Sequence, residues 1–392
     1  MIDELHLINF KCFADQRIRL APLTLLTGLN GMGKSSVIQS VLLLRQSYLD
    51  GILRHGTLLT AGDLVQLGAV TDVWFERAKE DLLGIRLSFS RRNKFGKRAP
   101  SVAQFNFHVI AEENLTLFGD EESIRSSIEV VEAQDGGSIF SKNLRTDHIG
   151  NFQYLGAERN GPRKFSPMLH SRASPLVLGS QGEYTLHVLE MFQDAIRIPP
   201  TDPRLVSAPS ERLRDQIEVW LGEISPGVNL SIKTIPDADL VVSGFSFGSA
   251  GQLRSRDYRA TNVGFGLSYV LPVLVALLAT PRGGLVLIEN PEAHLHPQGQ
   301  TKLGELCARA AAAGVQLIVE THSDHVMDGA RIAVRDGILD SSSAAFHYFQ
   351  RTSGEIGVSS PTLNSEGKLS EWPSGFFDQS RRNIARLLRP KQ

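Results

Sequence analysis

The feature that most constrains this chain is a glycine-rich segment of eight residues near its N-terminus. Gly28–Ser35 reads GLNGMGKS and fits the pattern GxxxxGK[ST]. The apolar run Leu23–Thr27 precedes it, and Ser35–Leu49 follows with apolar residues at helical spacing and no Gly or Pro. The sequence therefore predicts a phosphate-binding loop between a buried strand and a helix, in an α/β fold.

The residue types in this loop suit a nucleotide phosphate. Glycines let the backbone curl so that successive N–H groups face an anion, and the helix N-terminus adds positive partial charge. Lys34, expected on an exposed loop, is predicted to reach the β/γ-phosphates, and the Ser35 hydroxyl is predicted to bind Mg²⁺. ATP and Mg²⁺ are the expected cofactors; the alternative is a plain glycine turn. The predicted nucleotide-binding residues of the loop are Gly28, Asn30, Gly31, Gly33, Lys34, Ser35 and Ser36.

Composition narrows the class of protein further. The chain has 392 residues, of which 42% are hydrophobic, so it can bury a sizeable core in one large or two moderate domains. A net charge of -1 gives no bulk attraction to nucleic acid, although a local basic groove remains open. Cys12 and Cys307 form no metal-type pair, which favours a cytoplasmic protein. Neither a secretory signal nor a membrane segment is expected, because Val270–Thr280 is too short to span a bilayer.

Changes in sequence character suggest four parts. The middle part is expected to be a β-rich arm inserted into the core, with Ser126–Val131 as one of its strands. Ser210–Leu221 is expected to be a helix with Ser210 as N-cap. Alternating strands and helices in the third part predict a parallel sheet. The predicted parts are an N-terminal lobe with the phosphate loop (1–80), the arm and middle region (81–250), a C-terminal lobe (251–345) and a tail module (346–392).

A second chemical signal is an acid at the end of an apolar strand. Leu285–Ile288 is followed by Glu289, which we expect beside the phosphate-loop strand, where a carboxylate can hold Mg²⁺ or its water. Gln66 is a candidate ligand of Mg²⁺ and of the attacking water, with a surface polar residue as the alternative. Arg159 follows another strand and is expected on a solvated loop, with binding of phosphate or a partner as the alternative. The predicted metal ligands are Ser35, Gln66 and Glu289.

Three strings in the C-terminal half resemble a known superfamily. Glu289–Pro297 reads ENPEAHLHP and is similar to the Walker B and D-loop segment of ATP-binding cassette ATPases, in the branch of SMC, RecF and overcoming-lysogenization-defect (OLD) proteins. Glu320–Ser323 resembles the switch-histidine segment, and Asn262–Ser268 lies at the position of the signature motif. The strings also resemble bacterial predicted AAA-type ATPases with an uncharacterised C-terminal module. The resemblance covers about the first seventy residues and Ser255–Val334.

The resemblance implies a P-loop NTPase fold with an ATP-binding cassette core, and a homodimer that forms on ATP. Each ATP would lie between two protomers, touching Gly264, Gly266 and Ser268 of the partner protomer. The residues implied in catalysis are Glu289, Asn290, Glu292 and His322, with His322 sensing the γ-phosphate. The superfamily usually has a glutamate where this chain has Asn290; an amide cannot accept a proton, so hydrolysis should be slow. Glu292 is the candidate substitute base.

Three functions are consistent with these features. The first is an ATPase that dimerises on ATP and gates a protein partner; the resemblance implies a role linked to DNA, in repair or phage defence. The second is an OLD-like nuclease component whose partner chain cleaves, because no cluster of carboxylates of the two-metal type follows His322. The third is a non-catalytic ATP-sensing scaffold. The resemblance explains His296 and His322 without a metal, and zinc binding by the histidines is the lesser alternative.

Overall fold

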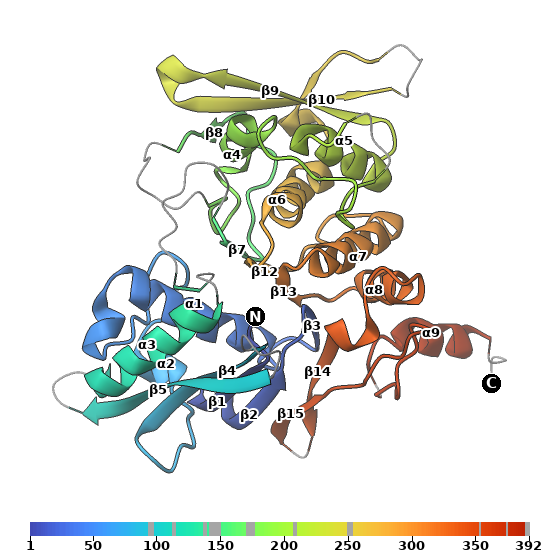
Figure 1. Cartoon of the computed structure of the whole chain (residues 1–392). Coiled ribbons are helices and arrows are strands. Elements are labelled where there is room, and N and C mark those ends of the chain that lie inside the picture. The colour runs from blue at the N-terminus through green and yellow to red at the C-terminus, as the bar shows by residue number, and fades with distance from the viewer. Residues whose placement is uncertain are drawn as a thin grey trace.

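The computed structural model describes most of the chain, and within the described residues the strands pair into three sheets (Figure 1). Figure 1 shows an antiparallel sheet at the lower left, a long hairpin at the top and a parallel sheet between them. The described residues are 1–92, 98–111, 115–135, 139–140, 150–169, 177–206, 210–248, 254–352, 354–373 and 375–388.

The N-terminal sheet is antiparallel throughout and has the strand order β2-β1-β4-β5-β6. Helix α3 packs against β5 of this sheet. The short α2 and the 3-10 helix η1 lie in the connection from α1 to β4. The elements are β1 (Glu4–Phe10), β2 (Phe13–Arg19), η1 (Ile52–His55), α2 (Val70–Val73), β4 (Leu82–Arg92), β5 (Arg98–Ala111), β6 (Leu115–Phe118) and α3 (Glu121–Asp135).

The strands expected in the β-rich arm form and join the N-terminal sheet, because β4 pairs with β1 from Glu4↔Ser88 to Ile8↔Gly84. One expectation about this region is wrong. The segment 126–131, expected as a strand, lies inside helix α3. The buried residues of α3 are Ile124, Ser127, Ile128 and Val131, which recur at the spacing of one helix face rather than at alternate positions.

The central sheet has the order β15-β14-β3-β13-β12-β7, and all of its strands are parallel except the edge strand β15. The sequence correctly predicted a parallel sheet in this half. Neighbouring residues along a strand face opposite sides of the sheet, which therefore separates two hydrophobic cores. The strands are β3 (Leu23–Gly28), β7 (Phe152–Leu155), β12 (Leu285–Glu289), β13 (Gln316–Glu320), β14 (Ala344–Thr352) and β15 (Glu355–Ser359).

Helices cover both faces of the central sheet. Buried residues of α1 belong to the core shared with the N-terminal sheet, whereas α6, α7 and α8 contribute to the other core. This arrangement leaves the carboxyl ends of β3, β13 and β12 as the place where loops from different parts of the chain meet. The helices are α1 (Lys34–Leu49), α6 (Phe265–Ala279), α7 (Pro297–Ala312) and α8 (Asp324–Arg335), with η3 (Ala260–Asn262) and η4 (Ser341–Ser343).

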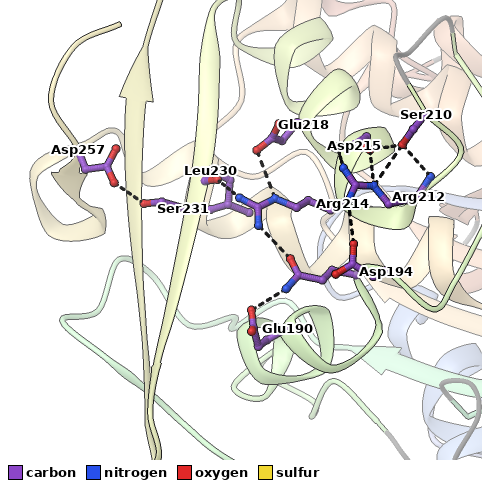
Figure 2. Close-up of polar contacts among 11 residues, drawn as sticks. Glu190, Asp194, Ser210, Arg212, Arg214, Asp215, Glu218, Leu230, Ser231 and Asp257 are labelled. Carbon is purple, nitrogen blue, oxygen red and sulfur yellow. Dashed lines mark hydrogen bonds and ion pairs between the residues drawn. The ribbon is translucent and has the colours of Figure 1, made fainter.

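The third sheet pairs β10 with β8, β9 and β11, and α4 and α5 pack beneath it. Figure 2 shows the polar contacts here, in which Ser210 and Arg212 both bond Asp215. Helix α5 begins at Leu213, so the expected N-cap at Ser210 is wrong: its hydroxyl is bonded to the Asp215 side chain instead. The elements are β8 (Ser166–Pro167), α4 (Thr185–Phe192), α5 (Leu213–Ile224), β9 (Val228–Ile235), η2 (Pro236–Ala238), β10 (Leu240–Phe247) and β11 (Tyr258–Arg259).

The C-terminal tail folds back onto the central core and ends in α9 (Gln379–Leu387). Phe376 is fully buried, and its ring lies 5.2 Å from that of Tyr348 and 5.4 Å from that of Trp372. Aromatic side chains near a terminus commonly anchor it in this way. No helix in the part of the chain that the structure describes is long and apolar enough to cross a membrane.

Candidate functional site

The glycine-rich loop takes a backbone path that other residues could not follow. Gly28 has φ 131°, and a Cβ there would lie 2.2 Å from the backbone oxygen of Phe349. Gly33 has φ 88°, and its Cβ would lie 2.5 Å from the Cys12 Sγ. Both positions combine a left-handed conformation with close packing, which only glycine tolerates. The loop is therefore held between β14 and the β1–β2 turn, directly before the first turn of α1.

The loop forms one wall of a cleft with a volume of about 1230 Å³. The walls carry five cationic and five acidic side chains together with aromatic and small residues, so the loop and not the overall charge of the cleft points to a phosphorylated ligand. Every predicted loop residue except Gly28, at the end of β3, lines this cleft. The lining residues are Lys11, Cys12, Phe13, Ala14, Asp15, Gln16, Asn30, Gly31, Met32, Gly33, Lys34, Ser35, Ser36, Gln39, Thr71, Asp72, Trp74, Phe75, Glu76, Arg77, Lys79, Glu320, Arg351, Gly354, Glu355 and Ile356.

Lys34 is folded against its own loop. Its Nζ donates hydrogen bonds to the backbone oxygens of Gly28, at 3.1 Å, and Leu29, at 2.8 Å. The side chain is only 3% exposed, so the expectation of an exposed lysine is wrong; burial lowers its pKa. The reason is that the loop carbonyls point inward and give the ammonium group partners before any phosphate does.

The acid nearest to Ser35 is Glu320, at the end of β13. Ser35 Oγ donates to Glu320 Oε2 at 2.8 Å, and Glu320 Oε1 lies 3.8 Å from Lys34 Nζ. The expectation that Glu289 lies beside the phosphate-loop strand is wrong, because β13 lies between β3 and β12. Sequence reasoning gave Glu320 no role, although it too follows an apolar strand, the same signal that singled out Glu289.

Glu289 lies one strand farther from the loop and is paired in register with Glu320. Its Oε1 accepts a hydrogen bond from the Tyr154 hydroxyl at 3.0 Å. Burial, and then the charge of Glu320, raise the pKa of Glu289. The buried carboxylate of Glu320, the half-buried carboxylate of Glu289 and the Ser35 hydroxyl thus gather at the carboxyl ends of adjacent strands. Such oxygen donors are the ligands that Mg²⁺ prefers, so the residues present fit the expected cation.

Asn290 directly follows β12 and has a left-handed backbone, with φ 46°. Asparagine tolerates this conformation better than most residues do. Its N–H donates to the Glu320 carbonyl at 2.8 Å, which ties the ends of β12 and β13 together. Among the described residues, its buried Oδ1 has no hydrogen-bond partner. An acceptor without a partner beside the two carboxylates can receive a hydrogen bond from a water molecule.

Arg159 holds the backbone at Glu289 and Asn290 in place. Its guanidinium donates to the backbone oxygens of Glu289 and Asn290, both at 2.6 Å. The residue is only 3% exposed, so the expected solvated loop is wrong. Burial lowers the pKa of Arg159 to about 10. The arginine is therefore a positioning residue that the sequence did not reveal, because the carbonyls of Glu289 and Asn290 are more than a hundred positions away in the chain.

Glu292 and His322 are brought together, but through the backbone of His322. Glu292 Oε1 accepts a hydrogen bond from the His322 N–H at 2.8 Å. Glu292 is 8% exposed and its pKa is raised by burial, so it faces neither the cleft nor the surface. His322 is exposed, although partial desolvation of its imidazole and then the charge of Lys34 lower its pKa. A neutral imidazole near pH 7 can donate one hydrogen bond and accept another.

The signature segment lies outside the phosphate-loop cleft. Gly264 caps the N-terminus of α6, and Phe265 is 55% exposed. Gly266 allows close contact with the D-loop, since a Cβ there would lie 2.6 Å from the backbone oxygen of His294. Ser268 is half-buried in the first turns of the helix. Pro272 has no N–H for the Ser268 carbonyl, so that oxygen keeps its capacity to accept a hydrogen bond.

Gln66 is not brought to the other predicted ligands. It is exposed, forms an isolated bridge with Ala61 and, among the described residues, is absent from the cleft lining. The loop that carries it is fixed by Gln46 of α1, whose side chain bonds Leu59 O at 2.7 Å and Val65 N at 3.0 Å. The structure therefore offers Ser35, Glu320 and Glu289 as the oxygen donors at this end of the sheet.

Comparisons with known proteins show the family and the fold of the chain. Residues 23–328 match the family described as "AAA domain, putative AbiEii toxin, Type IV TA system". The chain belongs to this AAA-domain family. Residues 339–387 match a second family, described as a protein of unknown function (DUF3696), which overlaps the predicted tail module.

This AAA-domain protein is similar to a curated relative and to two solved structures. The chain is 24% identical over 350 residues to the OLD nuclease of Thermus scotoductus, and the match covers 82% of this chain. The chain spans 59% of that relative's length. An SMC head bound to the C-winged helix domain of ScpA superposes with a TM-score of 0.50 at 14% identity, covering 92% of this chain and 98% of that one.

An SMC head with an extended coiled coil, bound to the C-terminal domain of ScpA from Pyrococcus furiosus, gives a TM-score of 0.51 at 10% identity, with 99% of both chains covered. At these identities the structural likeness shows the fold alone. Together with the family match, it confirms the predicted resemblance to SMC and OLD ATPases. It also confirms the predicted fold, an α/β P-loop NTPase.

Proposed function

We propose that this AAA-domain protein binds ATP with Mg²⁺ in the phosphate-loop cleft, hydrolyses it slowly and dimerises when ATP is bound. One observation carries the proposal: Gly264 and Phe265, at the start of the signature helix, are exposed and, among the described residues, lie outside the lining of the cleft of the same chain. A serine at a helix N-terminus can donate to a phosphate only if that phosphate comes within hydrogen-bond distance. A second protomer would supply that phosphate.

The residues of the cleft divide the work in this proposal. The loop N–H groups and Lys34 hold the phosphates, which requires Lys34 Nζ to leave the carbonyls of Gly28 and Leu29. Ser35 and the carboxylates of β12 and β13 hold Mg²⁺, which when bound offsets charge on the phosphates. Asn290, fixed by Arg159, orients water without accepting its proton, and His322 donates to the γ-phosphate. Because positioning and charge stabilisation carry most of the catalysis of phosphoryl transfer, the lack of a base at Asn290 should slow hydrolysis rather than abolish it.

Gel filtration with and without ATP and Mg²⁺, with turnover measured on the same sample, tests this proposal. We expect a monomer without nucleotide, a dimer with ATP and Mg²⁺, and slow phosphate release. A chain that stays monomeric at high concentration and saturating ATP would contradict dimerisation. A dimer without any turnover would favour the non-catalytic ATP-sensing scaffold, in which Asn290 keeps the ATP-bound dimer long-lived.

The dimer would gate a protein partner in this proposal, and the pathway would involve DNA, in repair or in phage defence. The SMC heads that share the fold were solved bound to ScpA domains, which supports a protein partner. Binding to DNA, if it occurs, should be driven by phosphate contacts and should weaken steeply with salt. No binding at low ionic strength, with or without nucleotide, would remove DNA from the proposal.

A second candidate function is that of an OLD-like nuclease component. It is favoured by the likeness to the OLD nuclease of Thermus scotoductus, of which this chain spans 59%. Within the residues that the structure describes, no group of three or more His, Cys, Asp or Glu side chains could hold a metal ion. Cleavage is therefore assigned to a partner chain in this candidate. Metal-dependent cleavage of DNA by the purified chain alone would contradict that assignment.

A further inference from the structure

We propose that Glu320 makes nucleotide binding depend on a divalent cation: its carboxylate pairs with Lys34 before the nucleotide binds and becomes a ligand of the cation afterwards. This inference rests on the proposed function, since it assumes that ATP enters the phosphate-loop cleft. It concerns a residue that lies outside the predicted set of metal ligands and that the tertiary structure brings to Ser35.

The contacts of the two carboxylate oxygens differ. Oε2 accepts a hydrogen bond from the Ser35 hydroxyl, with 2.8 Å between the two oxygens, and this contact fixes the Glu320 side chain beside the first turn of α1. Oε1 lies 3.8 Å from Lys34 Nζ, which is longer than a hydrogen bond and leaves an ionic contact only. The Ser35 oxygen can bind a cation through its lone pairs while its hydroxyl group still donates a hydrogen bond to Glu320.

Lys34 cannot neutralise the Glu320 carboxylate and a nucleotide phosphate equally well at the same time. Its Nζ now bonds the carbonyls of Gly28 and Leu29, on the loop side, with Glu320 at the edge of its reach. If Nζ turns to a nucleotide phosphate, Glu320 loses its positive neighbour while it remains largely buried. A buried carboxylate without a counter-charge is costly, and it also repels the incoming phosphates.

A divalent cation at Ser35 removes both costs. It replaces the charge of Lys34 beside Glu320 Oε1 and neutralises part of the phosphate charge. Glu289 is less suited to this role, because its Oε1 already accepts the Tyr154 hydroxyl and β13 separates its strand from β3. Nucleotide without the cation should therefore bind weakly to the wild-type protein.

The test compares ATP affinity by calorimetry in EDTA and in saturating Mg²⁺, and expresses the gain as a ratio. In the wild type we expect a large gain. In Glu320→Gln, which keeps the shape and loses the charge, metal-free ATP should bind more tightly, and the gain should fall by about 10- to 100-fold. The matched control is Glu355→Gln, the same chemical change at an exposed acid of the same cleft, which should leave the gain unchanged.

Glu320→Asp keeps the charge but shortens the side chain, so metal-free binding should stay weak while Mn²⁺ affinity in the presence of ATP, measured by electron paramagnetic resonance, should fall. Circular dichroism checks that each variant folds; if Glu320→Gln does not fold, Glu320→Asp decides alone. An unchanged gain in Glu320→Gln, or unchanged Mn²⁺ affinity in Glu320→Asp, overturns the inference. A wild-type protein that binds no ATP in either condition overturns the proposed function instead.

Discussion

The phosphate-loop region and the signature region are built from similar residues, but the first is hydrogen-bonded within the chain and the second begins at an exposed surface. Each places glycines and a serine at the start of a helix, α1 or α6. Lys34 and Ser35 find their hydrogen-bond partners within the chain. Phe265 is 55% exposed, and a Cβ at Gly264 would meet nothing within 4 Å.

The difference shows which half of a nucleotide site one chain can complete. Polar groups satisfied within the chain keep the phosphate loop in place before any ligand arrives, because a buried donor without a partner is costly. The start of the signature helix packs on the D-loop: Gly266 contacts the His294 backbone, and Tyr269 packs edge-on against the His294 ring at 4.7 Å. Gly264 and Phe265 stay exposed, and the proposed dimer would place a second protomer there.

The largest expected effect lies on the phosphate-loop side and concerns its missing base. Asn290→Glu should speed hydrolysis by about 10²–10⁴-fold, the range of an added general base. The left-handed backbone at φ 46° opposes part of this gain. Asn290→Asp supplies a carboxylate that tolerates this backbone better and serves as the second variant. Single-turnover rates measure both; a fast wild type that neither substitution changes would show that this side is already complete.

Glu292→Gln is the companion to that experiment. The amide can still accept the His322 N–H, whereas a proton can no longer be taken up. If Glu292 is the substitute base, hydrolysis by this variant should be slower than in the wild type. An unchanged rate would mean that Glu292 only positions the switch-histidine segment, as its burial favours.

Removing the loop lysine tests whether the phosphate-loop side works alone. Lys34→Ala should weaken ATP binding by about 10²-fold, since a hydrogen bond to a charged group contributes up to about 3 kcal/mol. The substitution also leaves the carbonyls of Gly28 and Leu29 without this donor, so its fold must be checked by thermal melting. Calorimetry measures the affinity, and an unchanged value in a folded variant would contradict the phosphate-loop assignment.

The exposed start of the signature helix is tested by placing an arginine at Ser268. Ser268→Arg should shift ATP-dependent dimerisation to at least about tenfold higher protein concentration, because burying a bulky unpaired charge at an interface costs more than about 1.4 kcal/mol. Sedimentation with ATP and Mg²⁺ measures this, and ATP binding by the monomer should persist. Ile332→Arg, at an exposed residue of α8, is the control that should dimerise normally. Equal dimerisation of both variants would break the comparison.

The last expected effect is on stability rather than on nucleotide binding, and it lies at the contact that fixes the phosphate-loop lobe to the tail. His347 on β14 contacts Arg19 O and Ser360 Oγ, both at 2.7 Å, and burial lowers its pKa from 6.5 to about 4. The unfolded chain thus binds the proton more readily, so stability should fall as pH drops from about 6.5 to 4, by at most about 3 kcal/mol. Melting temperatures across this range should be flatter in His347→Gln than in the wild type. Parallel curves would show that His347 does not titrate on unfolding.

Several parts of the site were predictable because their signals are local. Gly28–Ser35 is contiguous, and the strand before it and the helix after it can be recognised from their own spacing. The same holds for the strand that ends at Glu289 and for the glycines before α6. Local patterns report what a segment forms because strand alternation and helical spacing are properties of neighbouring residues.

What the tertiary structure alone decided is which of these segments lie side by side. The insertion of β13 between β3 and β12 brings Glu320, rather than Glu289, to Ser35. The burial of Arg159 beneath Asn290 likewise depends on packing between distant segments. Strand order in a parallel sheet is set by the crossovers between strands, and these depend on which apolar faces pack across the whole core. The sequence therefore determined the phosphate-binding loop, and the fold determined which carboxylate lies beside it.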